Sequence, residues 1–192
     1  MPIPLGVLAV AGAGAGPSAG AAYELLETVV LGSNQAEIDF TNLGTNYGST
    51  YKHLQIRMTH RAANSTRSDN IYLRFNGDTT GYALHFLYGN GSSVASGGSA
   101  NQTSMIVGRA TGATSGANIF GAAVFDILDW NNSNKNTTVR SFTTANDGTD
   151  NTVWLFSGLW IDTGAVTSIN LHTGAGDFVT GSRVSLYGLR SS

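Results

Sequence analysis

The sequence predicts an all-β protein, an antiparallel β-sandwich of jelly-roll-like form with an extended N-terminal arm. Three observations predict this fold. Short segments alternate between apolar and polar residues, turn-forming dipeptides separate these segments, and no stretch shows a convincing 3.6-residue periodicity. About eleven strands at such short spacing are typical of sandwiches and jelly rolls.

Alternation is clearest in three segments, Ala36–Phe40, Lys52–Thr59 and Asn70–Phe75. In the second of them, Leu54 and Ile56 point to one side, while Gln55 between them is polar and points to the other. A period of two is typical of a strand that is buried on one face only.

Eight further strands are expected from their apolar and β-branched residues. They cover Glu24–Leu31, Tyr82–Tyr88, Thr103–Gly108, Gly121–Leu128, Thr138–Phe142, Asn151–Trp160, Ser168–His172 and Arg183–Leu189. The first of these also fits a helix through Leu25 and Leu26, but the β-branched run Thr28–Val30 favours a strand.

Turn signals lie between these strands. Asn76-Gly77, Asn90-Gly91 and Asp147-Gly148 predict turns, and the Gly/Ser-rich tract Gly89–Ser99 predicts a loop. The one change in composition falls near Ala22. We therefore expect two parts, an arm over residues 1–22 and a β-sandwich domain over residues 23–192.

The arm opens with an apolar run and continues as alternating Ala and Gly over Ala11–Gly16. Its apolar positions are Ile3, Leu5, Val7, Leu8 and Val10. Gly loses much backbone entropy on ordering and offers no side chain to pack, so such an arm cannot bury itself. We expect it to dock on another protein chain.

Two other interpretations of the arm are less favoured. A secretory signal peptide fits the small residues Ala19–Ala21, but the basic n-region is missing and Pro2 and Pro4 interrupt the start. A transmembrane helix needs ~20 apolar residues, and the run is far shorter. The sequence thus predicts no membrane partner.

Composition excludes several classes of function. Only 11% of the 192 residues are charged, against about 25% in ordinary soluble domains. Ten scattered Lys and Arg and a net charge of −2 provide no basic stripe for nucleic acid. The absence of Cys removes disulfides, thiolate catalysis and thiolate metal sites.

No metal site or cofactor is expected. The four histidines, none at metal-ligand spacing with another ligand, are His53, His60, His85 and His172. His53 and His60 are seven residues apart, an odd offset that places them on opposite faces of one strand. The oxygen-rich loop Asn146–Asn151 lacks the acidic closure of a calcium loop and fits a self-capped turn.

No catalytic constellation stands out either. Asp126 and Asp129 flank a strand end and superficially suggest the two carboxylates of a glycosidase. Their spacing does not require them to face each other, and no nucleophile elbow or phosphate-binding loop is present. We expect a protein that is not an enzyme, with a polysaccharide depolymerase as a distant alternative.

The aromatic residues allow two interpretations. Trp130, with the neighbouring Asn131 and Asn132, is a candidate glycan contact on a neutral surface. The other interpretation, which we favour, is burial in the core and in an oligomer interface, because large aromatics dominate such burial. The candidate interface residues are Tyr82, His85, Tyr88 and Trp154. Val153–Phe156 is apolar on both faces, which also suits an interface strand.

A further pattern lies in nine segments that span nearly the whole chain, Pro4–Gly16, Tyr23–Thr28, Ile38–Thr41, Tyr51–Arg57, Leu73–Asp78, Asn118–Gly121, Ser157–Trp160, Val166–Ile169 and Leu186–Gly188. In these segments the chain resembles a family of small virion proteins of tailed phages that infect aquatic bacteria, including cyanobacteria. The resemblance implies a structural or tail-fibre-like role, a homotrimer and no catalytic residues.

These inferences lead to one expected function and one alternative. The first is a non-enzymatic structural protein on the outside of the virion, either a capsid decoration (cement) protein or a short fibre. Its arm would bind other virion proteins, capsid or tail, and an oligomer would present several arms at once. The alternative is a receptor-binding tail-fibre module that recognises host surface glycan.

Overall fold

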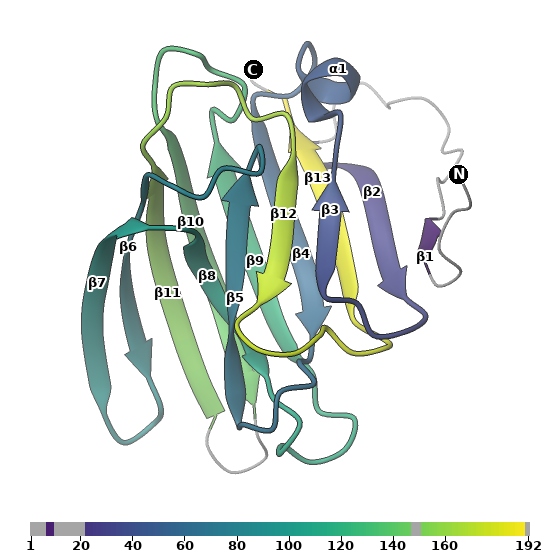
Figure 1. Ribbon diagram of the computed structural model, residues 1–192, viewed down its shortest axis with the longest axis vertical. Helices are drawn as coiled ribbons and strands as arrows, with labels where there is room; N and C mark the ends of the chain where they lie inside the picture. The colour runs from purple at the N-terminus through teal and green to yellow at the C-terminus, as the bar shows by residue number, and fades with distance from the viewer. Residues whose placement is uncertain (1–6, 10–21, 147–150, 191–192) are drawn as a thin grey trace.

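The computed structural model, which describes residues 7–9, 22–146 and 151–190, consists of two antiparallel sheets packed face to face (Figure 1). One sheet has nine strands in the order β1-β2-β13-β4-β9-β10-β11-β6-β7, and the other has four in the order β3-β12-β5-β8. The elements are β1 (Val7–Ala9), β2 (Glu24–Leu31), β3 (Glu37–Phe40), α1 (Leu43–Tyr47), β4 (His53–His60), β5 (Ser68–Phe75), β6 (Tyr82–Gly89), β7 (Val94–Gln102), β8 (Met105–Thr111), β9 (Gly121–Leu128), β10 (Thr137–Asn146), β11 (Asn151–Trp160), β12 (Ile169–Thr173) and β13 (Arg183–Leu189). The predicted all-β sandwich is confirmed, while its jelly-roll-like form stays a prediction.

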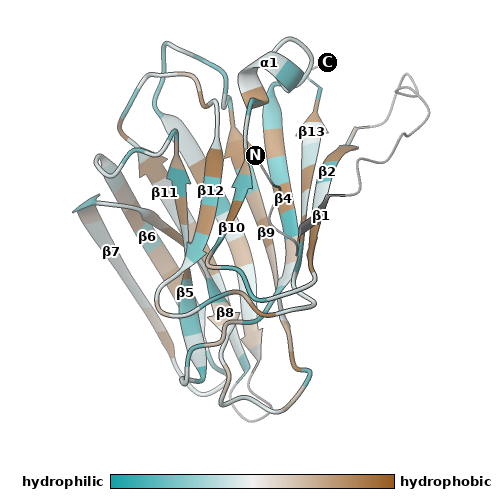
Figure 2. Cartoon of the chain, turned by 45° about the vertical axis from the view of Figure 1, so that its right-hand side comes forward, coloured by the Kyte–Doolittle hydropathy of each residue, from teal (hydrophilic) through white to brown (hydrophobic). Residues whose placement is uncertain are grey.

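The core lies between the two sheets. Hydrophobic and hydrophilic residues alternate along many of the strands (Figure 2). Ile56 of β4 and Phe125 of β9 lie opposite each other in register and are fully buried. Leu73 of β5 and Leu171 of β12 are paired in the same way in the small sheet and are also fully buried. Removing these inward side chains from water is the main force that holds the sheets together.

The small sheet covers only part of the large one. Its edge strand β8 packs over β10 and β11, and the β6–β7 hairpin extends beyond it (Figure 1). Aromatic rings fill the inner face at this margin, where Phe86, Tyr88, Trp154 and Phe156 form one cluster. The Tyr88 and Trp154 rings stack with centroids 4.3 Å apart, and the Arg109 guanidinium of β8 lies 5.1 Å from the Trp154 ring centroid.

Within the Gly/Ser-rich tract Gly89–Ser99, residues 90–93 form the turn between β6 and β7, which confirms the turn at Asn90-Gly91. Residues 94–99 belong to β7, so the prediction of a loop is wrong for that part. The two central glycines lie beneath rings of the neighbouring strand β6. A Cβ at Gly97 would lie 2.7 Å from the Phe86 ring, and a Cβ at Gly98 would lie 2.5 Å from the His85 ring. Ring coverage and pairing with β6 therefore offset the low strand propensity of this tract.

Other local predictions have mixed outcomes. The turn at Asn76-Gly77 is confirmed, because both residues have positive φ, 55° and 71°. The short helix α1 was not predicted; it follows Asn42 and buries Leu43. The turn at Asp147-Gly148 lies outside the described residues.

The described part of the arm, β1, pairs with the edge of β2, with Val7 opposite Leu31. Ile3, Leu5 and Val10 lie outside the described residues. At the other end of β2, Glu24 lies opposite Gly188 of β13, and Arg190 Nη2 is 3.0 Å from the Glu24 carboxylate. Within the described ranges, no helix has the length and apolar character needed to cross a membrane.

The two histidines of β4 lie on opposite faces, as predicted. His53 is partly exposed, whereas His60 is fully buried against Gly121 of β9, where a Cβ would lie 2.5 Å from the imidazole ring. Burial disfavours the charged imidazolium and lowers the pKa of His60 from 6.5 to about 4. The folded protein therefore holds this ring neutral at pH values where the unfolded chain protonates it.

This difference predicts acid sensitivity. Neutral His60 makes its full contribution to the free energy of unfolding above pH 6.5. This contribution is lost as the pH falls toward 4, because only the unfolded chain then binds the proton. We expect this site to reduce the free energy of unfolding by on the order of 3 kcal/mol over that range. Urea unfolding at several pH values should show a flatter pH dependence for His60→Phe than for the unmodified chain. Equal pH dependence in the two proteins would contradict the prediction.

Candidate functional site

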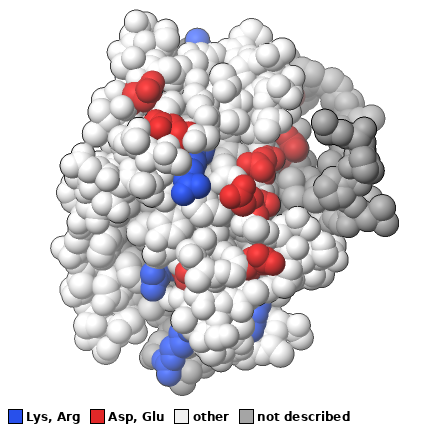
Figure 3. Space-filling model, in the orientation of Figure 1, with Lys and Arg blue, Asp and Glu red and all other residues white. Residues whose placement is uncertain are grey.

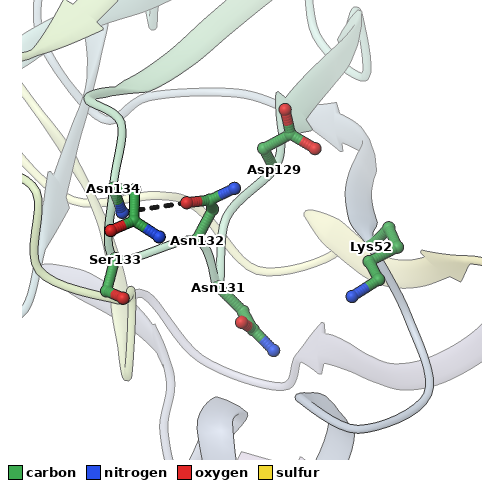
Figure 4. A pocket seen from close by; sticks show the side chains of 6 residues that line it. All are labelled: Lys52, Asp129, Asn131, Asn132, Ser133 and Asn134. Atoms are coloured by element: carbon green, nitrogen blue, oxygen red, sulfur yellow. Dashed lines mark hydrogen bonds between the residues drawn. The ribbon is translucent and has the colours of Figure 1, made fainter.

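A polar pocket of about 240 Å³ opens where the loop after β9 meets the start of β4. Its lining residues are Lys52, Asp129, Asn131, Asn132, Ser133 and Asn134 (Figure 4). We call this the Asn pocket. Its walls are amide, hydroxyl, carboxylate and ammonium groups, which suit a ligand rich in hydroxyl groups.

The loop that forms the Asn pocket is held from below by Trp130. This side chain is fully buried, and its indole Nε1 donates a hydrogen bond to the Tyr51 carbonyl at 3.1 Å. The Trp130 carbonyl accepts from the Val166 amide at 2.9 Å. One buried side chain thus fixes a loop whose neighbouring residues face solvent.

Side-chain amides fix the rest of the loop. Asn131 donates to the Gly48 carbonyl. Asn132 accepts at Oδ1 from the Asn134 backbone amide at 2.9 Å (Figure 4). Because these contacts hold the loop before any ligand arrives, the pocket is preorganised.

Asp129 supplies the negative charge at the Asn pocket. Its carboxylate forms an ion pair with Lys135, and its other oxygen lies 3.7 Å from His53 Nδ1. The hydrogen bond from Lys135 holds the pKa of the Asp129 carboxyl below its usual range. At neutral pH, Asp129 is therefore an ionised acceptor and not a proton donor.

The predicted glycan residues have different outcomes. Asn131 and Asn132 line the Asn pocket, and their contact with glycan stays a prediction. The prediction for Trp130 is wrong, because a ring with 0% exposure has no face on which a sugar can stack. Its apolar surface and its indole N–H are both used inside the protein.

The predicted interface residues do not share one surface. Tyr82 is fully buried, its hydroxyl accepts from the Phe75 amide at 2.8 Å, and burial raises its pKa to about 12. The prediction that Tyr82 lies at an interface is therefore wrong, because its side chain does not reach the surface of the chain. His85 is exposed on the outer face of the large sheet, whereas Tyr88 and Trp154 are partly buried on its inner face.

A row of apolar residues crosses the outer face of the large sheet, and residue-by-residue prediction missed it. Leu87, Leu155, Phe142 and Val124 lie opposite one another on β6, β11, β10 and β9. The first three side chains are 49%, 47% and 48% exposed. We call these four residues the apolar row; Leu155, Phe142 and Val124 also line a shallow depression of about 250 Å³. The sequence signal for it is that β11 is apolar on both faces.

A hydrogen-bonded ladder runs beside the apolar row. Gln55 accepts from Arg57 Nε at 2.7 Å and donates to Asp126 at 2.6 Å, and Arg140 donates to the other Asp126 oxygen at 2.9 Å. Asp126 therefore belongs to the outer sheet face, whereas Asp129 belongs to the Asn pocket. Each carboxylate is already paired with a cation.

Among residues 22–146 and 151–190, no group of three or more His, Asp or Glu side chains could hold a metal ion. Most of the oxygen-rich loop Asn146–Asn151 lies outside these ranges. Comparison of the chain with protein-family models, curated proteins and solved structures gives no match.

The burial of Trp130 predicts a stability effect. Trp130→Ala should cost about 3–5 kcal/mol through the cavity it leaves. Trp130→Phe, which leaves the Tyr51 carbonyl without its indole donor, should cost about 1–3 kcal/mol. Urea unfolding followed by circular dichroism measures both, with the exposed Ser157→Ala as a control expected within about 0.5 kcal/mol. A Trp130→Ala protein of unchanged stability would contradict the burial.

Proposed function

We propose that this chain is a non-enzymatic structural protein on the outside of a tailed-phage virion, a capsid decoration protein or a short fibre. The observation that carries the proposal is the apolar row. It leaves three large side chains about half exposed, side by side, on an ordered sheet. Such contiguous apolar surface is typical of a site that another protein covers.

Charge supports the same proposal. Acidic and basic side chains are sparse over the visible surface, and most of it is neutral (Figure 3). Burying charged side chains in an interface costs desolvation free energy. A neutral surface of this kind can pack against neighbouring subunits without desolvating many charges.

The strand order supports a jelly-roll interpretation of the body. Without β1 and the hairpins β6–β7 and β10–β11, the remaining strands run β2-β13-β4-β9 and β3-β12-β5-β8. Two such four-stranded sheets are expected of a jelly roll, an architecture that occurs in viral capsid domains. The two hairpins then widen one sheet without changing the eight-stranded framework.

The proposed attachment is through the arm, and the partners are other virion proteins. The part of the arm that the structure describes, β1, pairs through its main chain with β2 of the same chain, and we propose that the arm binds a neighbouring chain by the same kind of pairing. Strand addition of this kind is a common way for an extended segment to bind. We propose a homotrimer on the resemblance alone, and multivalent arms would then strengthen attachment.

Arm deletion tests the attachment. A chain lacking residues 2–20 should keep its circular dichroism spectrum but be lost from purified particles, as measured by quantitative mass spectrometry. The full chain, supplied in the same way during infection, should be incorporated. Equal incorporation of the two forms, or absence of the full chain from particles, would overturn the proposal.

A substitution in the apolar row tests its role separately. Leu155→Ser should lower incorporation at least several-fold, because it replaces an exposed apolar contact with a hydroxyl while leaving the core intact. Ser157→Ala, on the same strand and face, is the matched control and should behave like the unmodified chain. Unchanged incorporation of Leu155→Ser would show that the row is not an interface in the particle.

The Asn pocket favours a second function, recognition of host glycan. If the pocket binds sugar, the full chain should bind host polysaccharides on a glycan array, and Lys52→Ala and Asn134→Ala should abolish binding. Both side chains are exposed, so the fold should not change. Ser92→Ala, in an exposed turn, is the control. No binding across host polysaccharides would leave the structural role alone.

A further inference from the structure

Strand β7 leaves one edge of the large sheet unpaired in the part of the chain that the structure describes. It is the last strand in the order of the nine-stranded sheet and pairs with β6 on one side only. Its free side presents a row of main-chain N–H and C=O groups, which is a template for another strand.

The other end strands of the two sheets are short, charged or covered. β1 has three residues, and β3 has four, including Glu37 and Asp39. β8 carries Arg109 and packs over β10 and β11. Soluble proteins use such short length, charge and cover to prevent unwanted strand pairing.

β7 has none of these protections. It is nine residues long, and residues 79–108, which include all of β6 and β7, contain no Asp, Glu, Lys, Arg or Pro. Figure 3 shows no charged side chain over this edge of the molecule. Val94, at the start of the strand, is 80% exposed. The irregularity of the strand is confined to its far end, where Asn101 has a φ of 56°.

The middle of β7 is also open to a close partner. Gly97 and Gly98 carry no side chain, and the rings of Phe86 and His85 from β6 support the strand from its two faces. A neighbouring backbone can therefore approach this segment without meeting a bulky side chain of β7.

We propose that β7 pairs antiparallel with β7 of a second copy of this chain. A two-fold axis relates identical strands in antiparallel orientation, so the same edge supplies both sides of the contact. An uncharged strand can pair with its own copy without like-charge repulsion. It carries no charge that would attract an oppositely charged partner. The pairing joins two large sheets into one continuous sheet and does not depend on a virion role.

The chain contains no Cys, which permits a clean cross-linking test. Single cysteines are placed in the full chain at the exposed positions Ala95, Ser96, Ser99 and Ala100, and each protein is oxidised. A disulfide needs Cα atoms about 4.4–6.8 Å apart, so a position on the two-fold axis should give a dimer by itself on a non-reducing gel. If the axis lies at Gly97 or Gly98, a dimer should form only when two variants are mixed, Ala95→Cys with Ser99→Cys or Ser96→Cys with Ala100→Cys. A control cysteine at Ser92, in the preceding turn, should remain uncross-linked.

A charge substitution supplies the second readout. Ser96→Lys places on β7 the kind of residue that natural sheets use to block edge pairing, and Ser92→Lys adds the same charge in the turn. Sedimentation equilibrium of the unmodified chain and of Ser92→Lys should show a concentration-dependent doubling of mass, of the single chain or of the proposed trimer, and Ser96→Lys should weaken that pairing at least tenfold.

Three results would overturn the proposal. They are an unmodified chain whose mass does not double at high concentration, an assembly that Ser96→Lys leaves unchanged, and cysteines on β7 that cross-link no better than the control. If a β7 cysteine cross-linked only to a cysteine placed at Val7 of a second chain, the partner of the β7 edge would instead be the arm of that second chain.

Discussion

The four-stranded sheet is too narrow to cover the nine-stranded one, and this mismatch governs much of the molecule. Over the centre, the two sheets bury each other's inward side chains, such as Phe125 and Leu171. Beyond β8, the large sheet has to shield its inner face with its own side chains. The stacked rings of Tyr88 and Trp154 do this, and Arg109 closes over them from β8. The β6–β7 hairpin is built on this aromatic support.

Local sequence pattern predicts those parts of the fold in which each strand is buried on one face. Lys52–Thr59 and Asn70–Phe75 alternate strictly, and both are strands within one or two residues of the expected bounds. The pattern fails at residues 94–99, because Gly and Ser there have low intrinsic strand propensity. That segment becomes a strand only because Phe86 and His85, on another strand, cover its glycines.

The candidate site shows the same limit. The polar run Asn131–Asn134 is visible in the sequence, and it does line a pocket. The role of Trp130 is not visible there, because its burial depends on Tyr51 and Val166, which are distant in the sequence. Likewise, apolar residues on both faces of β11 indicate a second buried surface, but only the pairing register shows that Leu155 lies beside Leu87 and Phe142.

The neighbouring positions of Glu24 and Gly188 have a mechanical consequence. The backbone enters the sandwich on β2 and leaves it on the adjacent strand β13 at the same corner of the sheet. Force transmitted through an attached arm is therefore applied first to β2, with which β1 also pairs, and to its neighbour β13. A peptide grafted into the turn between β6 and β7 would extend from another part of the body, whereas one placed after β13 would start beside the first residue of β2.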